Sequence, residues 1–398
     1  MTEWKEYKLG EIVSIASGFA YKGEYIGKGE NLLLGMGCVS YKEKFLLSGA
    51  RPYAGDCAER YYAKVGDIVL ATRQQSDNLP ILGMPAIIPE DLKDKKLIIG
   101  ANLYRVTNNS DFDNKYIYWL LKTPDYVRYI ASCKTGTTVA MITKSDIENF
   151  AFVAPDKSGR ERILKIMDSL DDKIDLLHRE NKTLEAMAET LFRQWFIEEA
   201  KEDWEEVSLE YVCERITDGS HYSPESVESG LPMASVKDME DWGINLNSCR
   251  KISKEEFDKL VSADCLPQVN DILIAKDGSY LKHIFVVNKM QEVVILSSIA
   301  IIRPNGLYHP YLLSLLLKLD SIKEELKNIV TGAVIPRIVL KDFRKFPIIL
   351  PPKEKQEKAL LFIEPIMKKC FYNREQIQNL IQQRDSLLPK LMSGEVKI

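Results

Sequence analysis

Two runs of polar side chains follow the same apolar pattern at two distant places in the chain. The pattern occupies residues 65–71 and again residues 269–275, and in both copies an aspartate precedes a short apolar run. Arginine, glutamine, asparagine, lysine and serine are the side chains that pair with nucleic-acid base edges and phosphates. The candidates that follow the pattern are Arg73, Gln74, Gln75 and Asn78 in the first copy, and Lys276, Ser279, Tyr280, Lys282 and His283 in the second.

A second pair of matched loops lies further along each copy. Thr135-Gly136 is echoed by Thr331-Gly332, and the register then holds to the proline that ends each copy. For any single residue an ordinary polar surface loop is the simpler reading, so the prediction depends on the pairing. The framework repeats while the loops diverge, as expected of two copies that read two different targets. The candidates from these loops and from two earlier turns are Tyr21, Lys22, Thr135, Thr137, Thr138, Ser220, His221, Tyr222, Thr331 and Arg337.

The sequence contains no set of residues with the types and spacing of a catalytic site. Residues 35–37 begin like a phosphate-binding glycine loop, but Ser40 stands where the third glycine belongs. The four histidines have no metal-ligand spacing, and the seven cysteines occur singly, which favours a reducing compartment. We therefore expect neither a catalytic residue nor a metal site in this chain.

The composition is that of an ordinary soluble globular protein with room for two or three domains. The chain has 398 residues, of which 45% are hydrophobic and 28% charged. No apolar run is long enough to span a membrane and no leader pattern opens the sequence, so we expect a cytoplasmic protein. Because the formal net charge is −4, a DNA-binding protein of this composition would have to concentrate its basic residues on one face.

One stretch, residues 160–197, organises the sequence between the two copies. Its apolar positions recur at alternating steps of four and three, and no proline or glycine interrupts them. This spacing predicts one seam on a helix about 55–60 Å long, and so narrow a seam needs a second helix to cover it. The predicted seam residues are Ile163, Met167, Leu170, Ile174, Leu177, Asn181, Leu184, Leu191 and Trp195.

The covering helix is predicted near the C-terminus, from residue 353 towards residue 391. Pro365 lies inside it, and either kinks a continuous helix or marks a helix that begins only after it. An antiparallel pair would bring Asn181 close to Arg374, where polar groups set alignment without adding stability. Asn181→Leu should then raise the melting temperature or leave it unchanged. The seam residues predicted here are Leu360, Ile363, Met367, Arg374, Ile377, Ile381, Leu388 and Leu391.

The two globular copies mix short strands with helices. Residues 67–71, 97–106, 271–275 and 293–303 read as strands, and residues 115–130 and 311–329 have helical spacing. We predict an α+β chain of two similar α/β domains separated by two long antiparallel helices that form a coiled coil. The boundaries are residues 1–157 for the first domain, 158–200 for the first long helix, 201–352 for the second domain, and 353–398 for the second helix and tail.

In this order, the motifs resemble those of the specificity subunit of a type I restriction–modification system. The resemblance spans the chain and includes the Leu-Phe-Arg-Gln-Trp-Phe run at residues 191–196, the strand and loop at 271–279, and residues 388–395. Pro351-Pro352 followed by Glu354 and Gln356 is a further mark. The first copy departs from the pattern in two places. Pro155 is followed by neither a second proline nor the glutamine, and the repeated strand of this copy is followed by Thr-Arg-Gln instead of Asp-Gly-Ser.

The resemblance implies a non-catalytic subunit in which each target-recognition domain reads one half of a bipartite site in double-stranded DNA. The two helices would set the distance between the halves and dock two methylase subunits, which restriction subunits then join. No cofactor belongs to this chain, since S-adenosylmethionine, ATP and Mg²⁺ are used by the partner subunits. The missing Asn-Pro-Pro-aromatic or Asp-Pro-Pro-aromatic tetrapeptide of amino-methyltransferases agrees with this expectation.

Two other readings compete. A coiled-coil adaptor with two protein-binding modules and no DNA contact explains the helices equally well, but it does not explain polar loops at matched positions. A DNA-modifying enzyme in its own right is disfavoured by the missing catalytic motifs. Binding to random duplex DNA at two salt concentrations, with and without a methylase subunit, distinguishes an adaptor from a DNA reader.

Overall fold

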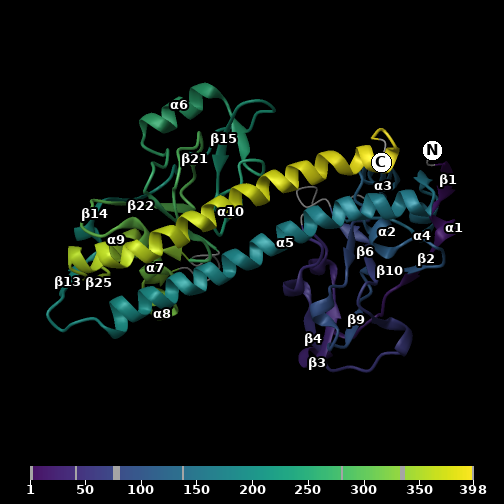
Figure 1. Ribbon diagram of the computed structural model, residues 1–398, viewed down its shortest axis with the longest axis horizontal. Coiled ribbons are helices and arrows are strands. Elements are labelled where there is room, and N and C mark those ends of the chain that lie inside the picture. The colour runs from purple at the N-terminus through teal and green to yellow at the C-terminus, as the bar shows by residue number, and fades with distance from the viewer. Residues whose placement is uncertain are drawn as a thin grey trace. The chain divides into compact units, whose positions relative to one another are not determined.

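In the computed structural model the chain divides into two compact units, each of which holds one of the repeated copies. The structure describes residues 3–40, 43–74, 81–136, 139–278, 281–331 and 337–396. Unit 1 comprises residues 1–173 and 380–398, and unit 2 comprises residues 174–379. The long helices α5 (Lys157–Arg193) and α10 (Lys353–Ser393) each begin in one unit and end in the other (Figure 1).

The main sheet has the same antiparallel topology in both units, with strand order β2–β10–β6–β8 in unit 1 and β14–β22–β19–β20 in unit 2. The unit 1 strands are β2 (Val13–Ser17), β6 (Ile68–Ala71), β8 (Pro85–Ile87) and β10 (Leu103–Asn108). The unit 2 strands are β14 (Cys213–Asp218), β19 (Ile272–Ala275), β20 (Ile284–Val286) and β22 (Ile299–Pro304).

A smaller sheet in each unit contains one parallel pair, β3 with β9 in unit 1 and β15 with β21 in unit 2. Its strands are β3 (Ile26–Leu34), β4 (Arg51–Tyr53), β5 (Tyr62–Ala63) and β9 (Leu97–Ile99), and β15 (Leu231–Ala234), β18 (Arg250–Ile252) and β21 (Val294–Ile295). The first and last strands of each copy also pair. These closing strands are β1 (Trp4–Lys8) with β12 (Ala151–Pro155), and β13 (Glu205–Ser208) with β25 (Pro347–Leu350).

Short helices and two-residue strands complete both units. The helices are α1 (Leu9–Ile12), α2 (Asn114–Leu120), α3 (Pro124–Cys133), α4 (Lys144–Glu148), α6 (Lys254–Ser262), α7 (Pro310–Lys318), α8 (Asp320–Leu326) and α9 (Leu340–Arg344). The short strands are β7 (Arg73–Gln74), β11 (Ala140–Met141), β16 (Met239–Glu240), β17 (Gly243–Ile244), β23 (Val330–Thr331) and β24 (Arg337–Ile338).

Each of the two predicted single helices is in fact a pair of helices. Thr123 caps α3 by accepting a hydrogen bond from the amide of Tyr126, and Pro124 occupies its first turn, so α2 ends before this point. Leu319 has an extended conformation between α7 and α8. The periodicity is continuous across these breaks because both members of each pair bury an apolar face.

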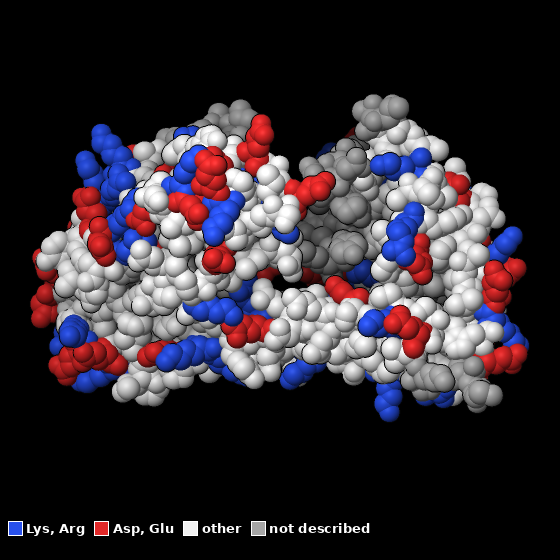
Figure 2. Space-filling view, turned by 90° about the horizontal axis from the view of Figure 1, so that it is seen from above, with Lys and Arg blue, Asp and Glu red and all other residues white. Residues whose placement is uncertain are grey.

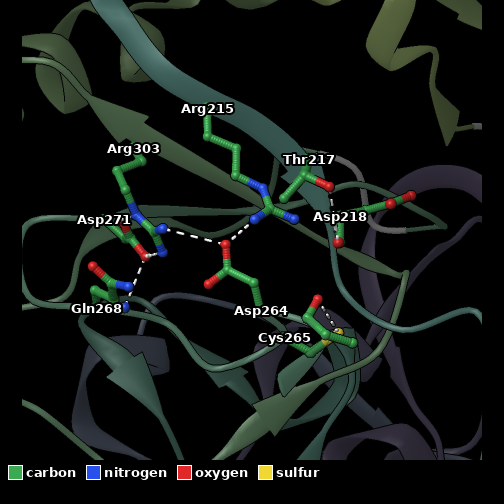
Figure 3. Close-up of polar contacts among 9 residues, drawn as sticks. Arg215, Thr217, Asp218, Asp264, Cys265, Gln268, Asp271 and Arg303 are labelled. Carbon is green, nitrogen blue, oxygen red and sulfur yellow. Dashed lines mark hydrogen bonds and ion pairs between the residues drawn. The ribbon is translucent and has the colours of Figure 1, made fainter. Parts of the chain in front are cut away.

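An arginine–aspartate pair sits at the start of the central strand in both units. In unit 2, Asp271 accepts two hydrogen bonds from the Arg303 guanidinium at 2.8 and 2.9 Å and one from the Gln268 amide at 2.7 Å (Figure 3). In unit 1, Arg105 donates one hydrogen bond to Asp67 at 2.9 Å. A buried carboxylate needs such partners, so the aspartate of the repeated motif supports the strand that leads to the polar loop.

The predicted helix seam is largely buried in unit 2. Leu184, Leu191 and Ala188 of α5 pack in one cluster with Ile363 and Met367 of α10. Higher-numbered residues of α5 therefore lie beside lower-numbered residues of α10, as in an antiparallel pair. The further seam residues of this unit are Ile174, Leu177 and Ile377, which are buried, and Trp195 and Leu360, which are half-buried.

The seam continues in unit 1 with the opposite ends of the helices. Ile163 and Met167 of α5 are fully buried in one cluster with Leu388 and Leu391 of α10. The remaining seam residues, Leu170 and Ile381, are half-buried. In both units the cluster also includes residues of the main sheet and its helices, so each domain shares one hydrophobic core with its part of the helix pair.

The predicted neighbour of Asn181 was wrong by one residue. Asn373 donates to the Asn181 side chain at 2.8 Å, whereas Arg374 turns away from the seam and donates to the carbonyl of Ile244 at 2.8 Å. Gly243 has a φ of +155°, which favours glycine, and a Cβ atom there would lie 2.6 Å from the Arg374 guanidinium and displace it. Arg374 therefore joins α10 to the β16–β17 hairpin and is not a seam residue.

Pro365 does not end the second helix, because α10 is helical from residue 353 to residue 393. A proline inside a helix removes the hydrogen bond to the carbonyl four residues earlier, here that of Leu361. Leu361, which carries this carbonyl, is 73% exposed and so lies on the outward side of α10. The alternative of a helix that begins after Pro365 was wrong.

Candidate nucleic-acid interface

The two polar loops that the sequence paired along the chain meet in space within each unit. In unit 1, Ile142 donates its amide to the carbonyl of Thr72, and β7 pairs with β11. In unit 2, Ile338 donates its amide to the carbonyl of Lys276 at 3.1 Å, and Asp277 forms a β-bridge with Arg337. The same backbone contact thus joins equivalent loops in the two copies.

A third segment joins these loops where the chain leaves the main sheet. Gly18 follows β2 and Gly219 follows β14, and an added Cβ at either glycine would lie 2.2 Å from a carbonyl oxygen of the neighbouring strand. The next residues form matching parallel bridges, Phe19 with Gly100 and Ser220 with Leu296. We call the meeting point of these three segments the three-loop junction: residues 17–22, 72–74, 135–136 and 139–142 in unit 1, and residues 218–222, 276–278 and 337–338 in unit 2.

The junction shows that Tyr21 and Tyr222 are equivalent, since each comes three residues after its close-packed glycine. The sequence analysis named both tyrosines but did not pair them. The Gly-x-x-Tyr spacing that they share would have shown that they are equivalent. Tyr21 is half-buried against the edge of the Tyr53 ring, whereas Tyr222 is 60% exposed. The equivalent positions therefore present different surfaces.

Several predicted residues are exposed at or beside the junction. Thr135 donates its hydroxyl to the Met141 carbonyl at 3.3 Å, which stabilises the loop, and Thr331 is placed by its backbone pairing with Arg337. The exposed candidates are Lys22, Arg73 and Thr135 in unit 1, and His221, Tyr222, Lys282 and Arg337 in unit 2. These side chains are free to meet a ligand without rearrangement of the core.

Other predicted residues form hydrogen bonds within the protein. Gln74 is 8% exposed, and its side-chain oxygen accepts the amide of Leu82 at 3.2 Å. Ser220 is buried and exchanges two hydrogen bonds with the backbone of Tyr222. His283 lies 3.0 Å from Asp241, and this hydrogen bond lowers the pKa of the Asp241 carboxyl. Their contacts hold the loops in shape.

Among the residues predicted to contact DNA, Lys276 differs most from its expected role. Only 4% of the residue is exposed, and its ammonium group forms an ion pair with Asp218. Asp218, at the end of β14, was missed in the sequence, although it stands directly before the close-packed glycine. Six candidates lie outside the described residues: Gln75, Asn78, Thr137, Thr138, Ser279 and Tyr280.

The surface charge is mixed on the face that Figure 2 displays, where lysine and arginine alternate with aspartate and glutamate. The expected concentration of basic residues is not found on this face. Within the part of the chain that the structure describes, no three His, Cys, Asp or Glu side chains gather as they would around a metal ion. None of the helices in the same residues has the length and apolar character of a membrane span.

Comparison with known proteins gives one consistent family. The model of the type I restriction modification DNA specificity domain matches twice, at residues 1–186 and 201–383. The type I restriction enzyme MjaIX specificity subunit of Methanocaldococcus jannaschii is 22% identical over 424 residues, covering 100% of this chain and 94% of that protein. The HindI specificity subunit of Haemophilus influenzae is 28% identical over 210 residues, which is 50% of this chain and 42% of that protein.

A solved structure shares the fold along the whole chain. The S subunit of a type I restriction–modification system from M. genitalium has a TM-score of 0.53 and 17% sequence identity, and the match covers 98% of this chain and 96% of that one. The predicted α+β architecture with two long helices is therefore confirmed. Because the family model covers both copies, with their matched sheets and three-loop junctions, this chain belongs to the type I restriction modification DNA specificity domain family.

Proposed function

We propose that this chain is the DNA-reading subunit of a type I restriction–modification enzyme, and that units 1 and 2 each read one half of a bipartite target in double-stranded DNA. The observation that carries the proposal is the duplicated three-loop junction. Its backbone contacts repeat between the units, while the exposed side chains differ. A repeated frame with different donors and acceptors suits two readers of unlike base sequences.

The helix pair would act as the spacer between the two halves of the target. Each added base pair rotates the second half by about 36°, so the gap must be held rigidly. The continuous helices α5 and α10 support this role, because each shares a hydrophobic core with the domain beside it in both units. In the same proposal the helices dock two methylase subunits, and restriction subunits join through the complex.

The chain would contribute recognition and no catalysis. S-adenosylmethionine, ATP and Mg²⁺ would belong to the partner subunits, and the complex would work in the cytoplasm without a membrane. The named relatives are specificity subunits, which supports this division of labour.

The test begins with the target sequence, read from the methylated positions in the host genome. The unit 2 variant carries Tyr222→Ala, Lys282→Ala and Arg337→Ala, and the matched unit 1 variant carries Tyr21→Ala, Lys22→Ala and Arg73→Ala. Each is assembled with the methylase subunit and titrated against duplexes altered in one half of the target. We expect each variant to lose discrimination at one half only, and at opposite halves.

Equal loss at both halves by each variant would contradict two independent readers. The adaptor alternative makes a different prediction, namely no salt-dependent binding to any duplex with or without the methylase subunit. A DNA reader that neutralises phosphates with lysine and arginine must bind more weakly as salt is raised. Measuring binding to random duplex DNA at two salt concentrations therefore distinguishes the two functions before the target sequence is known.

A further inference from the structure

One carboxylate in unit 2 joins a buried cation to an exposed imidazole. The Lys276 ammonium lies 2.5 Å from Oδ2 of Asp218, and Nε2 of His221 lies 3.2 Å from the same oxygen. The side chains of Lys276 and Asp218 are 6% and 15% exposed, whereas that of His221 is 72% exposed. Asp218 therefore lies between the interior of the domain and a side chain that faces solvent.

The backbone around this group is tied to the same short segment. Ser220 donates its amide to Ile295 and Lys276 donates its amide to Ser298, both at 2.9 Å, and Ser297 donates back to Ser220 at 2.9 Å. Segments 218–222 and 276–278 are thus held side by side by residues 295–298. The Lys276–Asp218 pair adds a direct side-chain link between them, in a place where screening by water is weak.

Unit 1 has the same frame without the charges. The position of Lys276 is taken by Thr72, whose carbonyl accepts the equivalent amide, from Ile142. The Thr72 hydroxyl donates to the carbonyl of Asn102 at 3.1 Å. Ser17 ends β2 where Asp218 ends β14. The frame therefore forms without an ion pair, and the charged link in unit 2 is an addition to it.

We propose that the Asp218–Lys276 pair is a positioning device: it orients His221 towards the DNA, and His221 sets base selection at the half of the target that unit 2 reads. Lys276 itself stays in the interior and touches neither base nor phosphate. This inference depends on the proposed function of unit 2. A lysine beside a recognition loop is expected to contact a phosphate. The proposal instead gives the buried Lys276 a role in positioning His221.

The test compares a buried and an exposed lysine of the same loop region. Lys276→Met and the control Lys282→Met are each assembled with the methylase subunit and titrated against the cognate duplex and against duplexes altered in one half, at several salt concentrations. For Lys276→Met we expect discrimination at the unit 2 half to fall by about tenfold, within the range of one base contact, with the salt slope unchanged. For Lys282→Met we expect a shallower salt slope with discrimination retained.

Two further variants show whether Lys276 acts through His221. His221→Ala should lose discrimination at the same half, and adding Lys276→Met to it should cost little more, because coupled residues are not additive. Lys276→Arg should keep the discrimination, because it keeps the ion pair. A salt slope lowered by about 0.9 in Lys276→Met would place Lys276 on a phosphate and overturn the inference. Unchanged discrimination in a folded Lys276→Met protein would overturn it as well.

If Lys276→Met does not fold, the double variant Asp218→Lys with Lys276→Asp is measured instead. It restores the pair and places a cation beside His221, so we expect recovered folding with discrimination still lost. Wild-type discrimination in that variant would overturn the inference. Failure of the proposed function is distinguishable, since Lys282→Met and Arg337→Ala would then also leave DNA binding unaffected.

Discussion

Asn181 and Asn373 share a buried hydrogen bond between the two long helices within unit 2. Nδ2 of Asn373 donates to Oδ1 of Asn181 at 2.8 Å, and Nδ2 of Asn181 donates to the carbonyl of Cys370 at 3.1 Å. Asn373 is fully buried and Asn181 nearly so. A polar pair inside an apolar seam specifies alignment, because a shift of either helix would leave both amides without partners.

This relationship reverses the expected effect of Asn181→Leu. The sequence alone predicted an unchanged or higher melting temperature, but the substitution leaves the buried Asn373 amide without its acceptor. We now expect the free energy of unfolding to fall by about 1–3 kcal/mol, measured by chemical denaturation. The double variant Asn181→Leu with Asn373→Leu should recover most of the loss. Equal stability of the single variant and wild type would show that the pair is not needed.

Breaking the ion pair between Arg384 and Asp171 in unit 1 should be more costly. Arg384 donates to Asp171 at 3.0 Å, and both side chains are at least nine-tenths buried. Arg384→Met removes a buried cation from Asp171, which keeps its ion pair with Lys44, and should lower the free energy of unfolding by about 3 kcal/mol. The control, Arg193→Met, removes the exposed pair with Glu189 and should change stability by at most about 0.5 kcal/mol. Similar losses in both variants would contradict the role of burial.

His309 should make the stability of unit 2 depend on pH. It caps α7 by accepting the amide of Tyr311 on Nδ1, and burial lowers the pKa of its imidazole below the ordinary 6.5. As the pH falls through 6.5 the unfolded chain binds the proton first, so this contribution to stability is present above that pH and is lost below it. His309→Asn keeps a capping acceptor without the titration. Denaturation at pH 7 and pH 5 should therefore show a smaller decrease for the variant than for wild type; equal decreases would exclude His309.

Lengthening both helices should change the preferred gap in the DNA target. One heptad with the seam pattern is inserted after Lys173 in α5 and after Asn379 in α10, where the two units meet along the chain. Seven residues add about 10 Å of helix, which corresponds to about three base pairs. The measurement is the affinity for duplexes of varied gap length. An unchanged optimum would mean that the helices do not set the spacing, and insertion into one helix only serves as the control, since it should disrupt the seam.

Much of the fold was predictable because its signals are local. The steps of four and three from Ile163 to Trp195 define a helix face, and most of the predicted seam residues are buried or half-buried. The repeated strands predicted at residues 67–71 and 271–275 are present as β6 and β19, each beginning directly after the aspartate. The sequence left open whether Pro365 kinks or ends the second helix, because the outcome depends on whether the carbonyl that loses its hydrogen bond finds another partner, which is a property of the tertiary structure.

The sequence by itself determined that the chain is doubled, that each copy presents polar loops after an equivalent strand, and that two long helices must pair. These follow from spacing within short segments, where residue type and period decide structure. Only the tertiary structure decided that Asn373, and not Arg374, meets Asn181, and that Lys276 turns inward to Asp218. Both contacts join residues far apart in sequence, and no local pattern specifies which of two adjacent side chains meets a partner on a distant segment.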